Sequence, residues 1–135
     1  MALHFHQYAA DAEHFVKEVA AEIGTTPDVS KADRQLRAVL HALRDRLAPS
    51  ESLQLIAQLP MLIKAIYVDG WRISEASGSV RRRGDFIEIV RAAGGKATHD
   101  DFTTDYEVEK AIHAVFKVLK RHVSKGEIDD IVATL

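Results

Sequence analysis

Apolar residues recur at steps of three and four along most of the chain, which is the period of an amphipathic α-helix. The first stripe predicts a helix over residues 5–23, with Gly24 in the place of a C-terminal capping glycine. A second stripe follows Ser30, a helix-capping residue type, with Asp33 in the first turn. The first stripe consists of Phe5, Tyr8, Ala12, Phe15, Val16, Val19, Ala20 and Ile23.

Two shorter apolar segments follow the second stripe. Pro49 suits the first position of a helix that runs through Leu59. Pro60 separates this helix from a further short helix over residues 61–68. Small and polar residues dominate residues 71–84, where no period is sustained, so a loop is expected there.

The rest of the chain is also helical in pattern. Residues 85–93 predict a helix, although FIEIV within it alternates briefly as a strand would. Two capping boxes, Thr104–Glu107 and Ser124–Glu127, open a long helix and a last helix that reaches Leu135. Because no stretch sustains the period of two that a strand requires, the predicted fold is all-α, a helical bundle of six or seven helices.

Composition places the chain among soluble globular proteins and predicts one domain over residues 1–135. The absence of cysteine excludes disulfides, thiolate metal sites and cysteine nucleophiles, and it is compatible with a cytoplasmic location. The net charge of −2 is shared equally between residues 1–67 and 68–135, which argues against nucleic-acid binding. The most apolar window, residues 53–68, is shorter than the roughly 20 residues of a bilayer span, so no membrane span is expected.

The segment over residues 36–59 recurs 76 positions later, over residues 112–135, without a gap. Six of the 24 positions are identical, including a glutamate just after each interhelical break. Two unrelated amphipathic helices would match at some apolar positions by period alone, but a matched glutamate is harder to explain in that way. Upstream, FVKEVAAEIG pairs with FIEIVRAAGG at a shift of 71. We therefore predict an internal duplication, with halves of roughly 1–69 and 70–135 packed on a shared core.

A resemblance to a known family rests on three stretches of the chain. They are TPDVSKADRQLRAVLHALRDRLAPSESLQLIAQLPMLIKAIYVDGW, RRRGDFIEIV and the second hairpin, which ends in VATL. Together they resemble the bacterial domain-of-unknown-function family 2267 over nearly the whole chain. The resemblance implies an all-helical, duplicated, cytoplasmic bacterial domain. It implies no activity, since none is established for the family, and therefore no catalytic residues.

Few residues carry candidate binding chemistry. Arg81, Arg82 and Arg83 form the densest basic cluster, and guanidinium groups bind phosphate or carboxylate in a bidentate manner. Acidic residues follow at once, so a solvated charge run is the favoured interpretation. Trp71, the single tryptophan, suits either the core at the junction of the halves or an interface, and its size favours the core.

Catalytic and metal-binding patterns are sparse. The run His99-Asp100-Asp101 has metal-ligand chemistry, but three adjacent residues do not converge easily on one ion, and a polar turn is favoured. The sequence has no G-x-S-x-G elbow, no glycine-rich phosphate loop and no H-E-x-x-H motif. No catalytic residue, metal or cofactor is therefore predicted.

Three functions remain open on these grounds. The leading hypothesis is a non-catalytic protein-interaction module, whose partner is another protein or a second copy of the chain. The second is a helical protein that binds an anionic or phosphate-bearing small ligand through Arg81, Arg82, Arg83 and Trp71. The third is a metal-dependent enzyme that uses the run His99–Asp100.

The two copies of the repeated hairpin end differently. The first continues past Leu59 into Pro60 and a short apolar helix, whereas the second stops at Leu135. If the second copy lacks a covering segment, apolar surface is expected near Ile131 and Leu135.

Overall fold

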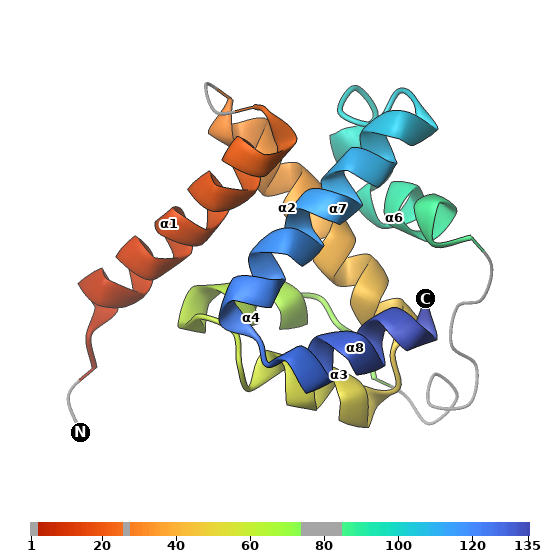
Figure 1. The fold of residues 1–135 in the computed structure, drawn as a ribbon. Helices are drawn as coiled ribbons and strands as arrows, with labels where there is room; N and C mark the ends of the chain where they lie inside the picture. The colour runs from red at the N-terminus through yellow and green to blue at the C-terminus, as the bar shows by residue number, and fades with distance from the viewer. Residues whose placement is uncertain (1–2, 26–27, 74–84) are drawn as a thin grey trace.

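The computed structural model describes residues 3–25, 28–73 and 85–135. Within these ranges the chain forms seven α-helices and one short 3-10 helix, and no strand, which confirms the all-α prediction (Figure 1). The elements are α1 (Phe5–Ile23), α2 (Val29–Arg46), α3 (Pro49–Ile56), α4 (Met61–Val68), α6 (Phe86–Gly94), η1 (Gly95–Thr98), α7 (Asp105–His122) and α8 (Lys125–Thr134).

Local capping chemistry sets the start of several helices. Thr104 and Ser124 cap α7 and α8, because each hydroxyl accepts a hydrogen bond from the backbone N–H three residues later, at 3.2 and 3.3 Å. The prediction that Ser30 opens α2 was wrong. The carboxylate of Asp28 accepts from the N–H of Lys31 at 3.0 Å, so the helix begins two residues earlier, at Val29.

The predicted C-terminal end is confirmed for α1 but not for α3. α1 ends as predicted, with Gly24 in the left-handed region at φ 92°. α3 ends at Ile56 rather than Leu59, and the N–H groups of Gln58 and Leu59 bond to carbonyls three residues back. This tightening precedes Pro60, and the residue before a proline is disfavoured in the α conformation.

α2 and α7, two helices of 18 residues each, contact one another at the centre of the molecule. α1 and α6 each pack against both of them. α3 and α8 lie side by side at the bottom of Figure 1, and α4 packs against α1 and α2. The outer end of α1 extends away from the other helices (Figure 1).

Buried apolar side chains from all seven of these α-helices form one cluster. The fully buried members include Phe15 of α1, Leu40 of α2, Tyr67 of α4 and Leu119 of α7. Burial of apolar area at about 25 cal/mol per Å² is the main force that holds the helices together. No helix in the described ranges is long and apolar enough to cross a membrane.

The surface near the last residue only partly matches the expectation for that end. Ile131 is fully buried in the same apolar cluster, so it offers no exposed apolar surface. Val132 and Leu135 are 53% and 38% exposed.

Candidate functional site

Ion pairs fasten α1 to α7. The guanidinium of Arg121 on α7 donates to Glu18 at 2.8 Å and also to Glu22, and Lys117 pairs with Glu22 at 3.2 Å. Burial alone would raise the pKa of Glu18, but hydrogen bonds from Arg121 and His122 outweigh it, so the pKa of Glu18 is lowered. Hydrogen bonds from Arg121 and then Lys117 lower the pKa of Glu22. These carboxylates are therefore held ionised and serve as anchors between helices.

A second polar contact ties the turn after η1 to α2. Both oxygens of Asp101 accept hydrogen bonds from Arg34, at 2.7 and 3.0 Å, and Asp101 is only 4% exposed. The amide of Gln35 donates to the backbone carbonyl of Asp101 at 3.2 Å. Asp101 thus has a structural partner, whereas His99 and Asp100 are exposed. The described part of the chain holds no group of three or more His, Asp or Glu side chains that could bind a metal.

A third set of polar contacts holds α4 in place. The hydroxyls of Ser52 and Tyr67 lie 2.7 Å apart in the interior, and burial raises the pKa of Tyr67 despite this hydrogen bond. Arg44 of α2 donates to the carbonyls of Tyr67 and Asp69, at 2.8 and 2.7 Å. The ring of His41 donates from Nε2 to the carbonyl of Ile66 at 2.8 Å.

These three sets share one property: their ion pairs and hydrogen bonds join residues from different segments of the chain. Burial lowers the pKa of His41, more than its bond to Ile66 raises it, so the ring is held neutral as a hydrogen-bond donor. In the described residues, these interior polar groups therefore hold helices and turns together.

An apolar groove opens on the surface between α1, α2 and α4. It has a volume of about 660 Å³, and five of its nine lining residues are apolar. The charged residues on its rim are Glu13, Asp33 and Lys17, so the rim is net negative. The lining residues are Ala12, Glu13, Val16, Lys17, Val29, Ser30, Asp33, Leu62 and Ile66. We call this surface the α1–α4 groove.

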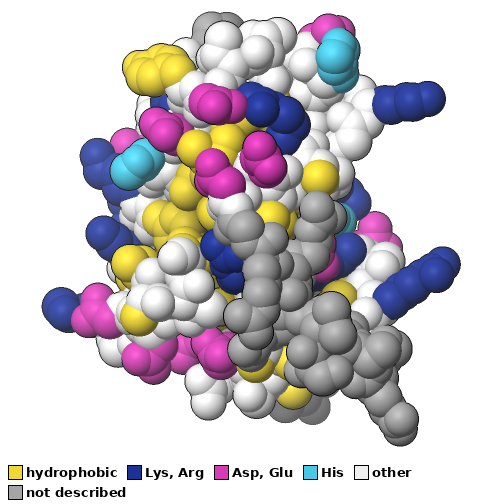
Figure 2. All heavy atoms as spheres, turned by 90° about the vertical axis from the view of Figure 1, so that its right-hand side faces the viewer, with side chains coloured by type: hydrophobic (Ala, Val, Ile, Leu, Met, Phe, Trp, Pro, Cys, Tyr) yellow, Lys and Arg dark blue, Asp and Glu magenta, His cyan; other side chains and the backbone are white. Residues whose placement is uncertain are grey.

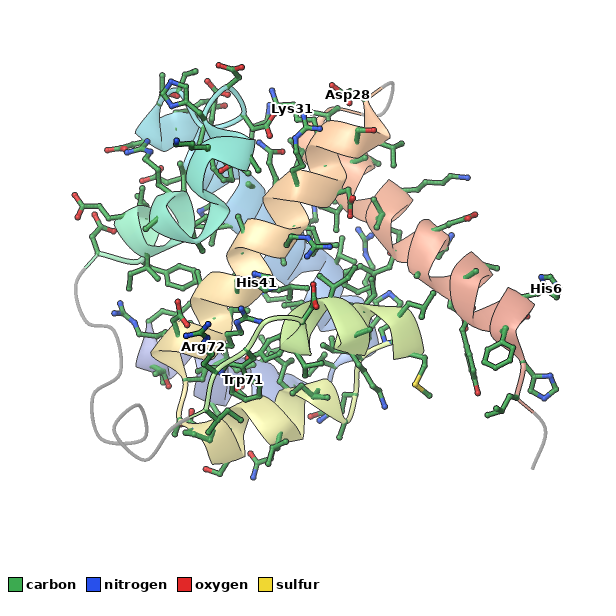
Figure 3. All side chains as sticks on the ribbon, turned by 180° about the vertical axis from the view of Figure 1, so that it is seen from behind. His6, Asp28, Lys31, His41, Trp71 and Arg72 are labelled. Carbon is green, nitrogen blue, oxygen red and sulfur yellow. The ribbon has the colours of Figure 1, made fainter. Side chains whose placement is uncertain are left out.

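The outer part of α1 lies beside this groove. We call residues 3–14 the arm; none of them is buried. Leu3 is 65% exposed and Phe5 69% exposed, although Phe5 belongs to the same apolar stripe that is buried further along the helix. Figure 3 shows His6 at the far end of α1, well away from the other helices. The arm thus carries exposed apolar side chains beside an apolar groove, and exposed apolar surface of this kind marks interaction sites.

The opposite side of the molecule differs in character. Figure 2 views the side of α6 and the chain's last residues, where Lys and Arg side chains lie among Asp and Glu, with narrow apolar areas between them. Mixed charge of this kind is typical of a solvated surface.

The sequence-predicted ligand site is only partly described. Arg81, Arg82 and Arg83 lie outside the described residues. Trp71 is half-buried rather than a full member of the core, and its ring stacks edge-on against Tyr67 with the centroids 6.0 Å apart. Figure 3 shows Trp71 and Arg72 together, on the other side of the molecule from His6.

Sequence reasoning missed the groove. Its three walls come from segments that are separated in the sequence, and no local pattern shows that they meet. One signal was available: the apolar stripe of α1 runs unbroken from Phe5 to Ile23, which is longer than the packed part of the helix. An apolar stripe that is longer than the helices packed against it leaves an exposed apolar surface.

The geometry defines an all-α protein whose described residues carry an open apolar groove and polar groups that are engaged in structural contacts. The family model described as "Uncharacterized conserved protein (DUF2267)" matches residues 12–135, nearly the whole chain. The chain therefore belongs to the DUF2267 family, as its resemblance indicated. The matched region includes all the residues of the groove but begins after most of the arm. No curated protein matches the chain.

Proposed function

We propose that the chain is a non-catalytic protein-interaction module that binds an amphipathic helix in the α1–α4 groove. The observation that carries the proposal is the apolar lining of an open surface groove, with Leu62 40% and Val29 38% exposed at its edge. Helices that bind in such grooves insert apolar side chains spaced at three and four residues. The structural engagement of Glu18, Asp101 and His41 favours this function over a catalytic one.

NMR of the chain with isotope-labelled methyl groups tests this function. The probe is a synthetic amphipathic helical peptide with a Leu/Ala face and Lys in its first turn, chosen to suit the acidic rim. We expect the methyl signals of Val16, Leu62 and Ile66, which line the groove, to shift during the titration. The signal of Val132 on α8, which is not a lining residue, should stay unchanged. Leu62→Lys should abolish the shifts. Shifts scattered over all methyl groups, or none at all, would contradict the proposal.

We further infer that the chain is one domain built by internal duplication. The bounds of α2 and α7 differ by 76 residues at both ends, and the first residues of α3 and α8 differ by the same number. α1 and α6 end 71 residues apart, and Phe15 and Phe86 are both buried. The contacts support the same relation, since α1 packs on α7 as α6 packs on α2, and α3 packs on α8. Each half thus covers the long helix of the other, and α4 has no counterpart in the described part of the second half.

A further inference from the structure

We infer that the α1–α4 groove binds the arm of a second copy of the chain, and that the exchange is reciprocal in a two-fold dimer. This inference rests on the proposed function, because it names the partner of the same groove. Three observations carry it: the spacing of apolar residues on the arm, the charges of the first turn of α1 and of the groove, and the place of α1 in the groove wall.

The apolar face of the arm and the groove has a self-complementary spacing. Phe5, Ala9, Ala12 and Val16 follow one another at steps of four, three and four residues, the spacing of a coiled-coil seam. Reversing the chain direction leaves these steps unchanged. An antiparallel pair of α1 helices with its two-fold axis between residues 10 and 11 therefore sets Phe5 opposite Val16 of the second copy. It also sets Ala9 opposite Ala12 of the second copy, where small side chains let the helices approach closely.

The groove wall explains why such pairing fills the groove. Ala12 and Val16 belong to α1 and also line the groove, beside Leu62 of α4. A helix laid antiparallel along α1 therefore brings its Phe5 over the groove, against the edge formed by Leu62. The same contact occurs twice by symmetry, and both exposed arms are covered in one closed dimer.

The charges favour the same arrangement. The first turn of α1 contains no acidic residue, and His4 and His6 flank the exposed Phe5. The N-terminal end of a helix also carries a partial positive charge from its aligned peptide dipoles. The rim that receives it, with Glu13 and Asp33 against Lys17, is net negative. The first turn of α1 in one copy thus matches the groove of another in apolar content and in sign, whereas the acidic residues of the arm, Asp11 and Glu13, lie further along the helix, and Glu13 is itself part of the rim.

Sedimentation equilibrium with a charge-swap pair tests the inference on the full chain. We expect the native chain to form dimers reversibly. Phe5→Glu places a negative charge against the acidic rim, and Leu62→Lys places a positive charge against the positive end of the arm. Each variant alone should weaken dimerisation at least tenfold. An equimolar mixture should recover dimers, because one contact is then native and the other pairs the two introduced charges. Val132→Glu, at an exposed apolar site on α8, is the matched control and should dimerise normally.

Disulfide trapping gives a second readout that does not depend on weakening the dimer. The chain contains no cysteine, so an introduced pair reports on itself alone. Mixed Ala9→Cys and Ala12→Cys chains should form a heterodisulfide much faster than either pairs with Ala57→Cys, an exposed position at the end of α3. Circular dichroism verifies that every variant keeps its helix content.

Several results would overturn the inference. These are a chain that stays monomeric up to about 0.5 mM, a dimer that survives both charge substitutions, a mixture that recovers nothing, or equal trapping at all cysteine positions. Failure here is separable from failure of the proposed function. A monomeric chain whose groove methyl groups still respond to the synthetic peptide retains the function and loses the second copy as partner, whereas a monomeric chain with an unresponsive groove loses both.

Discussion

Phe5 and Ile23 lie on the same face of α1, eighteen residues and about five helical turns apart, yet Phe5 is 69% exposed and Ile23 only 4%. The helix therefore carries one apolar stripe with two different surroundings. The buried residues of α1 all lie in its inner half, from Phe15 to Ile23, and none of residues 3–14 is buried. The difference separates residues that hold the fold from residues available to a partner, and it leads to the first prediction.

Truncation of the two phenylalanines of α1 should have very different effects on the monomer. Phe15→Ala removes a fully buried ring and should lower the free energy of unfolding by about 3–5 kcal/mol. Phe5→Ala should change it by less than about 0.5 kcal/mol, because its ring is mostly in water already. Urea denaturation at a concentration low enough to keep the chain monomeric measures both. A cost for Phe5→Ala close to that for Phe15→Ala would show that the arm is part of the folded core.

Local signals in the sequence predicted most of the helices, and tertiary relationships were beyond them. α1 and α4 begin and end where the period, Gly24 and Pro60 placed them, because caps and breakers act within a few residues. FIEIV forms part of α6 in spite of its brief alternation, since Asp85 caps the helix through the N–H of Ile87.

The missed features all depend on contacts between distant segments. Glu18 and Arg121 are separated by 103 positions, and only the packing of α1 on α7 brings them together. The sequence places Asp101 in a polar turn, whereas in the structure it pairs with Arg34 across 67 positions and is buried. A pattern along the chain reports which face of a helix is apolar, but not which helix covers that face or how far the cover extends.

The Arg34–Asp101 pair should be needed for stability. Asp101→Ala removes the acceptor of two guanidinium hydrogen bonds at a site that is 4% exposed, and should cost about 2–3 kcal/mol. Asp100→Ala, in the same turn but exposed, is the matched control and should cost less than about 0.5 kcal/mol. Thermal or urea unfolding separates the two. Equal effects would indicate that the turn tolerates loss of the pair and that Asp101 is not an anchor.

The Ser52–Tyr67 hydrogen bond should show coupling between α3 and α4. Tyr67→Phe leaves the buried hydroxyl of Ser52 without its partner and should cost about 1–2 kcal/mol, and Ser52→Ala should act similarly on Tyr67. The double variant should cost clearly less than the sum of the single changes, because it leaves neither hydroxyl unpaired. A double-mutant cycle by urea denaturation measures this. Additive costs would show that the two hydroxyls do not stabilise one another.

His41 should make stability depend on pH near neutrality. Burial lowers the pKa of His41 in the folded chain, so the unfolded chain binds this proton more readily. Stability is then highest above the unfolded imidazole pKa of about 6.5 and falls as the pH drops below it, by at most about 1.4 kcal/mol per pH unit from this group. His41→Gln should flatten the stability profile between about pH 5 and 7. His113→Gln removes an imidazole from the exposed face of α7 and is the matched control. An identical slope in all three proteins would contradict the assignment.

The network of Glu18 and Glu22 with Arg121 should stabilise the α1–α7 contact in a salt-sensitive and pH-sensitive manner. The pKa values of both carboxyl groups are lowered in the folded chain, so their contribution is present above the unfolded glutamate pKa of about 4.3 and is lost as the pH falls through the folded values. Arg121→Gln should therefore lower Tm at pH 7 and much less at pH 3. The Tm difference should also shrink at about 1 M NaCl, where the Debye length is only about 3 Å.

Lys120→Gln removes the same charge from the neighbouring position and should have a smaller effect, because the structure pairs Arg121 and not Lys120 with these carboxylates. A Tm difference for Arg121→Gln that is unaffected by salt and pH would mean that the side chain acts through packing, and α1 would then be held to α7 by apolar contacts alone.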